Sequence, residues 1–317
     1  MASLITGGTG FLGVELTRLL LERGETKPVL LDLSPSTQRL DDVADRVNLV
    51  RGDLGNFSDV LDTVKASKPD VIYHLGGMLT LLSEAHPSAA MRANVLGTFH
   101  VLEAARLFGV RQVVFSSSLA TYGMDIHGDV IDDYTLQRPS RFYGATKVFG
   151  EHMGRFYKRK YGLDFRGIRY PSIIGPGVTT PGAVQYMSWM IEELAKGKPF
   201  VIWTEPETAI PILYFKDAAR ALVELGEAPL ERINTVVYVL AGVKPTPAAQ
   251  ELANMVRRRI PGAEISFAPD PSRLDVRSRQ IDDSNAQREW NWKPMYDHER
   301  IVDDFLQELR LHPQRYI

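Results

Sequence analysis

The first residues of the chain restrict its fold more than any other stretch. An apolar run at residues 2–5 leads into a glycine-rich segment at residues 6–13, and an amphipathic stretch follows at residues 14–23. This order predicts a strand, a tight turn and a helix. A glycine turn in this place, between a strand and a helix, is typical of a dinucleotide-binding loop.

Each glycine of this motif has a physical reason. Gly7 permits a tight turn that a Cβ atom would obstruct, and Gly10 lets the backbone approach a pyrophosphate. Gly13 lets the new helix pack closely against the strand. The free N–H groups at the start of the helix would then face the phosphates. The residues of this loop predicted to contact a dinucleotide are Gly7, Gly10, Phe11, Leu12 and Gly13.

Asp32 ends a second apolar run, residues 28–31, about twenty residues after the glycines. A carboxylate in that position accepts hydrogen bonds from both ribose hydroxyls of NAD and repels the 2′-phosphate of NADP. We therefore predict NAD as the cofactor. The alternatives are a purely structural glycine turn, and an Asp32 that only caps a turn at Ser34 and Pro35.

Strand and helix patterns alternate along the first half of the chain. Further strands are predicted at residues 47–50, 71–75, 110–115 and 163–170, and helices at residues 57–66, 87–108 and 143–161. Such alternation indicates βαβ units and a doubly wound parallel sheet, the Rossmann α/β fold. Ligands of these sheets bind beyond the carboxyl ends of the strands.

Small and polar residues stand at several of these strand ends. Those expected to contact the cofactor are Asp53 and Leu54 after the third strand and Leu75, Gly76 and Gly77 after the fourth. Two roles are open for Asp53, because it either reaches the adenine end of the cofactor or caps the helix that follows. His74 is predicted to be a packed strand residue rather than a catalyst.

The composition narrows the class of protein. The 317 residues carry a net charge of -2 and are 44% hydrophobic, which indicates a globular chain with no field that attracts nucleic acid or an anionic membrane. Zero cysteines exclude disulfides, thiolate catalysis and cysteine-bound metals, and we predict no metal site. No apolar run reaches membrane-spanning length, and the N-terminus leads directly into the first strand. We expect a cytoplasmic protein.

The sequence changes character after residue 170. Prolines and glycines crowd residues 171–182, which favours a loop that frames a ligand. We predict an NAD-binding Rossmann domain at residues 1–172 and about 210–242, and a smaller α/β substrate-binding domain at about 173–209 and 243–317. The chain is expected to return to the first domain with the segments 210–214, 216–225 and 235–240. The smaller domain is expected to hold helices at 183–196, 248–259 and 298–309 and strands at 199–203 and 264–268.

Tyr143 and Lys147 lie four residues apart, on one face of a predicted helix. A lysine beside a tyrosine stabilises the phenolate, so the phenol pKa, normally about 10, is expected to move towards neutral pH. The tyrosine can then act as a general base. Three serines at residues 116–118 follow the fifth strand, where Ser118 can hold a substrate oxygen beside the phenol.

The order of these motifs resembles the extended short-chain dehydrogenase/reductase family, the NAD-dependent epimerase/dehydratase group. The motifs are the glycine turn, Asn94 in an Asn-x-x-Gly-Thr setting, the serine run and the Tyr-x-x-x-Lys pair. The resemblance implies that Tyr143 is the catalytic acid/base and that Lys147 binds the nicotinamide ribose and lowers the tyrosine pKa. It also implies that Ser118 orients the reacting hydroxyl, with Ser117 as a neighbour able to substitute. Asn94 matches the family's helix-kinking active-site residue, and an amide bonded to its own helix backbone is the alternative.

Several further stretches resemble the short-chain type of L-threonine 3-dehydrogenases within that family. They are residues 81–83, 137–139, 161–166, 169–171, 179–180, 281–284 and 290–293. This resemblance implies oxidation of the β-hydroxyl of L-threonine to 2-amino-3-ketobutyrate with NAD, in a homodimer built on the two long helices of the first domain. Cofactor contacts are also expected at Asn94, Tyr143, Lys147, Tyr170 and Pro171. The expected substrate contacts are Ser83, Ser118, Tyr143, Thr179, Thr180 and Arg277.

Two positions depart from the pattern of that group. Pro181 and Gly182 stand where those enzymes tend to have Asp-Tyr, and Arg277 stands where they tend to have Trp. A guanidinium at residue 277 is able to grip a carboxylate or phosphate in bidentate fashion, and a solvated surface arginine is the alternative. Both departures concern the choice of substrate.

Two other functions compete with dehydrogenation. A nucleotide-sugar epimerase or dehydratase with bound NAD ranks second, because the segment at 210–217 lacks the arginine with which such relatives grip the diphosphate. A non-enzymatic NAD sensor that binds a protein partner ranks third, because Ser118, Tyr143 and Lys147 are all intact.

Overall fold

Seven strands form the central sheet of the computed structural model, which describes residues 2–123, 125–180, 182, 184–270 and 279–316. Across the sheet the order is β11-β7-β5-β4-β1-β2-β3, and all neighbouring pairs are parallel. The strands are β1 (Ser3–Thr6), β2 (Val29–Asp32), β3 (Asn48–Arg51), β4 (Val71–His74), β5 (Gln112–Ser118), β7 (Asp164–Tyr170) and β11 (Val237–Val239). The doubly wound α/β fold expected from the sequence is confirmed.

The strand order reverses at β1. The chain adds β2 and β3 on one side of β1 and then returns to add β4, β5, β7 and β11 on the other side. In an open parallel sheet the crevice for a ligand lies at the carboxyl ends of the strands, at this switch point. The topology therefore places the expected cofactor crevice between β1 and β4.

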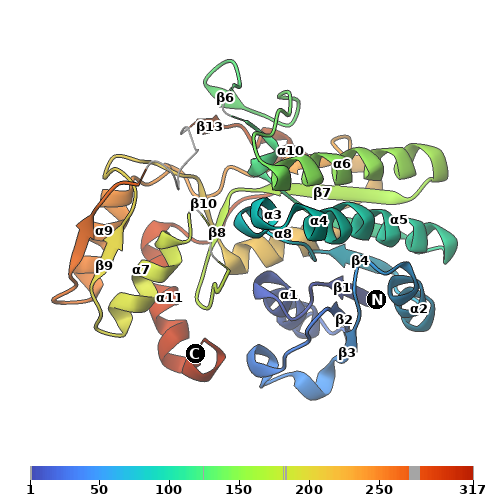
Figure 1. The fold of residues 1–317 in the computed structure, drawn as a ribbon, viewed down its shortest axis with the longest axis horizontal. Helices are drawn as coiled ribbons and strands as arrows, with labels where there is room; N and C mark the ends of the chain where they lie inside the picture. Colours follow the sequence, from blue (N-terminus) through green and yellow to red (C-terminus); the bar gives the residue numbers. More distant parts are fainter. Residues whose placement is uncertain (1, 124, 181, 183, 271–278, 317) are drawn as a thin grey trace.

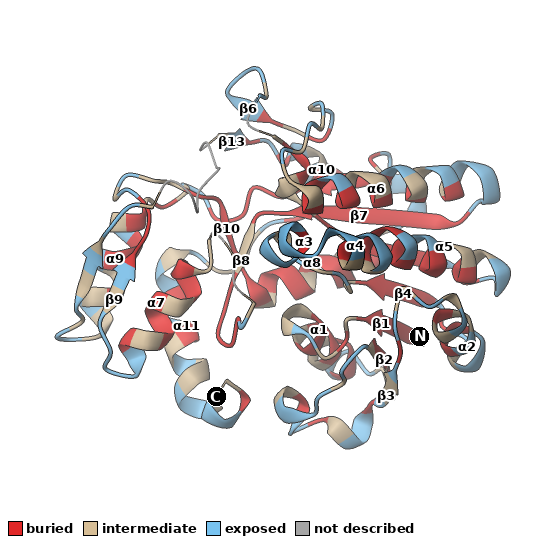
Figure 2. Cartoon of the chain, viewed as in Figure 1, coloured by how far each residue is buried: buried red, intermediate tan, exposed pale blue. Residues whose placement is uncertain are grey.

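Helices cover both faces of this sheet (Figure 1). On one face lie α1 (Phe11–Glu22) and α8 (Phe215–Glu227), and on the other α2 (Phe57–Ser67), α5 (Gly97–Leu107) and α6 (Phe142–Tyr161). The strands alternate between the two apolar cores, as the period of two requires: Ile5 packs with α1, whereas Leu4 packs with α2 and α5. Figure 2 shows the strands buried between these helical layers.

Short-range signals set the ends of several helices. Asn56 begins α2, and its side chain accepts a hydrogen bond from the backbone N of Ser58 at 3.1 Å. Gly162 ends α6 in the left-handed conformation, with φ of 73°, as the sequence predicts. The remaining short elements of this lobe are α3 (Thr80–Ala85), α4 (Pro87–Ala90) and the 3-10 turns η1 (Gln38–Leu40), η2 (Ala44–Arg46), η4 (Leu119–Thr121) and η5 (Leu230–Arg232).

A smaller α/β lobe stands beside the sheet and has its own apolar core (Figure 1). It contains α7 (Tyr186–Ala195), β9 (Phe200–Ile202), α9 (Ala249–Arg259), β12 (Ile265–Phe267) and α11 (His298–Leu311), followed by η6 (Pro313–Arg315). Helix α10 (Ser284–Trp290) packs instead on the core of the large sheet, through Ala286 and Trp290. Strands β9 and β12 pair in parallel. Two further two-stranded ladders join β8 (Ser172–Ile174) to β10 (Ile212–Tyr214) and β6 (Val130–Ile131) to β13 (Gln280–Ile281).

The structure differs from the sequence predictions at three elements. Strand β5 continues to Ser118, so the serines form its end instead of following it. The helix expected at residues 87–108 is interrupted by a π-helical segment, η3 (Met91–Leu96). Of the two strands expected to return to the first domain, β11 joins the large sheet, whereas β10 pairs only with β8. The exact domain boundaries stay a prediction.

Candidate active site

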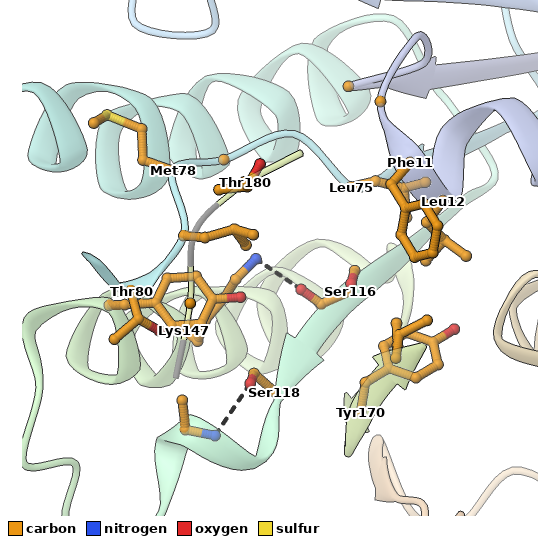
Figure 3. A pocket seen from close by; sticks show the side chains of 18 of the residues that line it. Phe11, Leu12, Leu75, Met78, Thr80, Ser116, Ser118, Lys147, Tyr170 and Thr180 are labelled. Carbon is orange, nitrogen blue, oxygen red and sulfur yellow. Dashed lines mark hydrogen bonds between the residues drawn. The ribbon is translucent and has the colours of Figure 1, made fainter. Parts of the chain in front are cut away.

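A cavity of about 880 Å³ opens along the carboxyl ends of the sheet strands (Figure 3). Its walls come from the glycine turn, from the ends of β2, β3, β4, β5 and β7, and from the loop around residue 180. The predicted cofactor residues that line it are Gly7, Gly10, Phe11, Leu12, Gly13, Asp32, Asp53, Leu54, Leu75, Gly76, Gly77, Tyr143, Lys147, Tyr170 and Pro171. The sequence motifs thus converge on one space.

The glycine turn brings bare backbone to the cavity wall. Gly7 has a φ of +67°, and a Cβ atom there would lie 2.8 Å from the Cα of Gly76. A Cβ atom on Gly13 would collide with the carbonyl oxygen of Gly7. Gly10 precedes α1 without a side-chain cap, so no side chain shields the start of the helix from the cavity. Such a cradle of backbone N–H groups at a helix N-terminus suits a phosphate.

Asp32 and Asp53 line the cavity from the ends of β2 and β3. Asp32 accepts hydrogen bonds from the backbone N of Thr9 at 3.1 Å and of Ser34 at 3.4 Å. Asp32 therefore caps the turn at Ser34, as the alternative interpretation expected. Its carboxylate borders the cavity as well. Asp53 accepts from the N of Gly55 at 2.8 Å. The interpretation of Asp53 as a helix cap is wrong, because Asn56 caps α2.

Helix α6 carries Tyr143 and Lys147 towards the serine run at the end of β5. Lys147 donates from Nζ to the carbonyl oxygen of Ser116 at 2.8 Å, and Figure 3 marks this bond with a dashed line. The side chain of Ser118 acts on the phenol of Tyr143 and lowers its pKa. The hydroxyl of Ser118 also accepts from the N of Ala120 at 3.1 Å. A phenol and a serine hydroxyl thus meet at the floor of the cavity.

The acid–base properties of this pair differ from the sequence prediction. Burial raises the pKa of Tyr143 to about 12, and only the side chain of Ser118 opposes this effect. Burial lowers the pKa of Lys147 to about 8, and the charge of Glu151 opposes this change. The Nζ atom lies 5.6 Å from the centre of the phenol ring. The lowered tyrosine pKa expected from the spacing is wrong for this arrangement, because burial is the largest influence on the phenol and raises its pKa.

Asn94 lies within the π-helical segment η3 and is buried. Its amide oxygen accepts from the N of Met78 at 2.7 Å, and its amide nitrogen donates to the carbonyl of Met78 at 3.0 Å and to Thr146 at 3.1 Å. The interpretation of an amide bonded to its own helix is therefore wrong. Asn94 joins the loop after β4 to α6 and stands behind the cavity wall. A π-helical turn at such a place is common near functional sites.

Three other residues singled out from the sequence have structural hydrogen bonds, and of these only Ser117 also lines the cavity. Ser117 donates to Oε1 of Glu151 at 2.5 Å, so its hydroxyl is not free to replace that of Ser118. Ser83 is fully buried and donates to the carbonyl of Met78 at 2.9 Å. His74 contacts Thr6 at 2.7 Å and Thr98 at 3.0 Å. Its packed, structural character is confirmed.

Some cavity residues were missed from the sequence. Thr179 and Thr180 line the cavity as predicted, whereas Arg277 and Pro181 lie outside the described residues. The lining residues that no motif indicated include Gln38, Arg39, Thr80, Arg141, Gln185 and Arg279. They come from loops and from the smaller lobe, where no local pattern marks a binding residue. Glu151 was missed as well, although its position four residues after Lys147 on the same helical face was a usable signal.

Comparison with known proteins agrees with this geometry. Residues 3–241 match the model of the NAD dependent epimerase/dehydratase family. The mitochondrial L-threonine 3-dehydrogenase of Bos taurus is 32% identical over 312 residues, which are 96% of this chain and 81% of the relative. The D-erythronate dehydrogenase of Cupriavidus necator is 34% identical over 279 residues, 84% of each chain.

Comparison with solved structures agrees with the sequence comparison. The L-threonine 3-dehydrogenase of Trypanosoma brucei superposes with a TM-score of 0.89 at 30% identity, over 98% of this chain and 97% of the other. The holo form of the GalE-like L-threonine dehydrogenase of Cupriavidus necator has a TM-score of 0.89 at 28% identity, over 98% and 100%. The Thermotoga maritima UDP-glucose 4-epimerase, with a TM-score of 0.87 at 22% identity over 98% and 99%, shares the fold.

Proposed function

The chain belongs to the NAD-dependent epimerase/dehydratase family, and from this premise we propose that it is a dehydrogenase that oxidises L-threonine to 2-amino-3-ketobutyrate with NAD. The carrying observation is that Ser118, Tyr143 and Lys147 line one cavity together with the glycine turn and Asp32. The relatives that bear the name L-threonine 3-dehydrogenase support the choice of substrate.

The residues around the cavity fit a dinucleotide. The glycine turn offers a backbone cradle that a Cβ atom would fill, and Asp32 offers a ribose acceptor at the end of β2. Tyr170 and Pro171 would border the nicotinamide end, with Leu75 and Gly76 beside the turn. NAD, when bound, supplies the hydride acceptor that the side chains of this protein lack.

Side chains of this protein would orient the substrate and transfer the proton. Ser118 would hold the oxygen of the substrate hydroxyl, and Tyr143, in its phenolate form, would take the hydroxyl proton as the substrate carbon is oxidised. Lys147, as a cation, would stabilise the phenolate and bind the nicotinamide ribose. Asn94 would fix the loop at Met78 against α6. These roles are proposals that rest on geometry and on the family resemblance.

The smaller lobe is proposed to bind the substrate. Thr179 and Thr180 line the cavity from the loop that leads into this lobe. Contacts of Arg277 and Ser83 with the substrate stay predictions, and Ser83 would need to act through the loop at Met78, since its hydroxyl bonds that carbonyl.

We also propose a cytoplasmic homodimer. Large apolar side chains are exposed on η3, α5 and α6, including Met91, Leu96, Phe99, Leu107 and Phe156. A surface of this kind, on the two long helices, suits a second copy of the chain. No helix in the described part of the chain is long and apolar enough to cross a membrane.

The direct test is turnover by purified protein. We expect NADH to form from L-threonine and NAD, with little reduction of NADP. D-erythronate is the second candidate substrate, because the relative of that name is 34% identical. Absence of NADH formation with every hydroxy acid and hydroxy amino acid offered, together with binding of a UDP-sugar, would favour the epimerase alternative instead.

A further inference from the structure

Helix α6 presents a row of three polar side chains to the end of β5. Tyr143, Lys147 and Glu151 are spaced four residues apart, so they lie on one face of the helix. Each is associated with a different member of the serine run: Tyr143 lines the cavity with Ser118, Lys147 donates to the carbonyl of Ser116, and Glu151 accepts from Ser117. The row therefore has a third member beyond the tyrosine and the lysine.

Glu151 is 1% exposed and fully engaged. Its carboxylate accepts from the hydroxyl of Ser117 at 2.5 Å and from the amide of Gln137 at 3.0 Å. Arg169 of β7 donates to it in bidentate fashion, with Nε–Oε1 and NH2–Oε2 distances of 3.0 and 2.7 Å. Burying a carboxylate costs free energy unless it is paired with a cation and accepts hydrogen bonds, as Glu151 does. These bonds fix the position of the Glu151 side chain.

The contacts of Arg169 continue this network towards the cavity. Arg169 donates to the hydroxyl of Tyr122 at 2.7 Å and to the carbonyl oxygen of Asp133 at 3.0 Å. Tyr122 lines the cavity and follows the serine run in the chain. Asp133 in turn accepts from Asn285 at 2.9 Å. The network thus ties the end of β5 and the loop after it to one rigid point on α6 and β7.

Three elements, β4, β7 and α6, contribute the titratable groups around Lys147. His74 of β4 is neutral at physiological pH, because burial and then the charge of Lys147 lower its pKa to about 3. Arg169 of β7 carries a positive charge that Glu151 pairs. On α6 itself, Tyr143 is a protonated phenol. Among the described groups, Glu151 is the carboxylate whose charge favours the ammonium form of Lys147.

We propose that Glu151 is a positioning residue for the oxidation described above. Through Ser117 it fixes the end of β5 that carries Ser118, and through its negative charge it keeps Lys147 cationic. The inference rests on the proposed function for its catalytic consequence, whereas the state of Lys147 is a property of the protein itself.

Glu151→Gln is the sharpest change, because it keeps the volume and one accepting oxygen and removes the charge. We expect kcat/KM near pH 7 to fall about tenfold and its acid limb to move about one pH unit higher, since a less cationic Lys147 stabilises the phenolate less. Glu151→Asp, which keeps the charge, should retain the parental position of that limb.

A second measurement needs no substrate. The rate at which Lys147 is acetylated by acetic anhydride, followed by mass spectrometry, reports the fraction of neutral amine. At pH 7 we expect this rate to be about fivefold higher in Glu151→Gln than in the parent, because the lysine pKa falls when the neighbouring negative charge is lost. If the parent oxidises no threonine, the proposed function fails while this measurement still decides the role of Glu151.

Asp164→Asn is the matched control, because it removes the carboxylate charge from another buried arginine pair of β7, with Arg166 at 2.8 Å. It should lower stability without moving the pH profile or the acetylation rate. Parental values of both in folded Glu151→Gln would overturn the proposal. If that variant does not fold, Ser117→Ala replaces it. A lower kcat with a parental acetylation rate would then support the positioning role, and an unchanged kcat would overturn it.

Discussion

Strand β7 carries a buried arginine–carboxylate pair at each end, and the two pairs have different surroundings. At the amino end, Arg166 pairs with Asp164 and donates to the carbonyl oxygens of Leu225 and Ala228, both at 2.6 Å. At the carboxyl end, Arg169 pairs with Glu151 and donates to Tyr122, which lines the cavity. The same chemistry is therefore used once to join β7 to α8 and once beneath the candidate active site.

The difference follows from direction in a parallel sheet. All carboxyl ends of the strands meet at one edge, where helices such as α1 begin with free N–H groups, so polar residues there can face a ligand. At the amino ends, polar groups find partners within the protein: Ser3 bonds Glu25 at 2.8 Å, and Gln112 bonds Asp164 at 2.9 Å. Position along the strand, more than residue type, separates a structural group from a functional one.

The largest effect is expected at the carboxyl edge, from Tyr143→Phe. Removing the phenolic hydroxyl deletes the proton acceptor, so kcat should fall by a factor of about 10²–10⁴ while NAD affinity stays unchanged. Steady-state kinetics and titration of NAD by calorimetry measure the two quantities.

Tyr157→Phe is the control for this change. Tyr157 lies on the same helix but bonds Glu103 at 2.8 Å, away from the cavity. Its loss should leave kcat unchanged. If Tyr143→Phe retained more than a tenth of the parental kcat, the prediction that Tyr143 is catalytic and Tyr157 structural would be contradicted.

At the amino edge the expected effect is on stability. Arg166→Met leaves the carboxylate of Asp164 with Lys158, 3.5 Å away, as its remaining cation, which should lower the free energy of unfolding by up to about 3 kcal/mol. The folded fraction should keep the parental kcat/KM, because no partner of Arg166 lines the cavity. Urea unfolding followed by circular dichroism tests the first statement and kinetics the second. A folded variant with impaired kinetics would contradict the separation of the two edges.

Asp32→Ala should weaken cofactor binding more modestly. Loss of a charged acceptor for the ribose hydroxyls costs about 1.5–3 kcal/mol, so the Kd for NAD should rise roughly ten- to a hundredfold. Rejection of NADP should relax, since the negative charge is lost with the acceptor. Asp62→Ala, an exposed carboxylate of α2, is the control. Unchanged preference for NAD over NADP in Asp32→Ala would assign selectivity to another residue.

The smallest effect concerns His74, which stands at the functional edge but has a structural role. Burial lowers its pKa to about 3 in the folded protein, whereas an unfolded histidine titrates near 6.5. As pH falls below that value the unfolded chain takes up the proton first, so stability is lost on acidification. Between about pH 6.5 and 5 this amounts to up to about 2 kcal/mol.

His74→Gln should make the dependence of stability on pH shallower over this range, because the replacement does not titrate. Urea midpoints of parent and variant at a series of pH values measure the difference between them. Parallel curves would show that another group, and not His74, takes up the proton on unfolding.

Local chemistry allowed much of the fold and the cofactor side to be predicted from the sequence. A strand, a glycine turn and a helix are set by contacts within about twenty residues. The Tyr143–Lys147 row follows from the 3.6-residue helical period. Asp32 was found because it ends an apolar run at a fixed distance from the glycines. Such patterns can be recognised in the sequence without knowing which distant residues lie nearby in the fold.

Partners far apart in the sequence were decided only by the tertiary structure. Asn94 bonds Met78 and Thr146, and Ser117 bonds Glu151, across 16, 52 and 34 residues. The phenol pKa depends on burial, which the spacing of Tyr143 and Lys147 does not encode. The sequence by itself thus determined which groups are present and in what order they meet the sheet edge. Folding decided which serine of the cavity wall is bound to a buried carboxylate, because only the packing of α6 on the sheet brings Glu151 to Ser117.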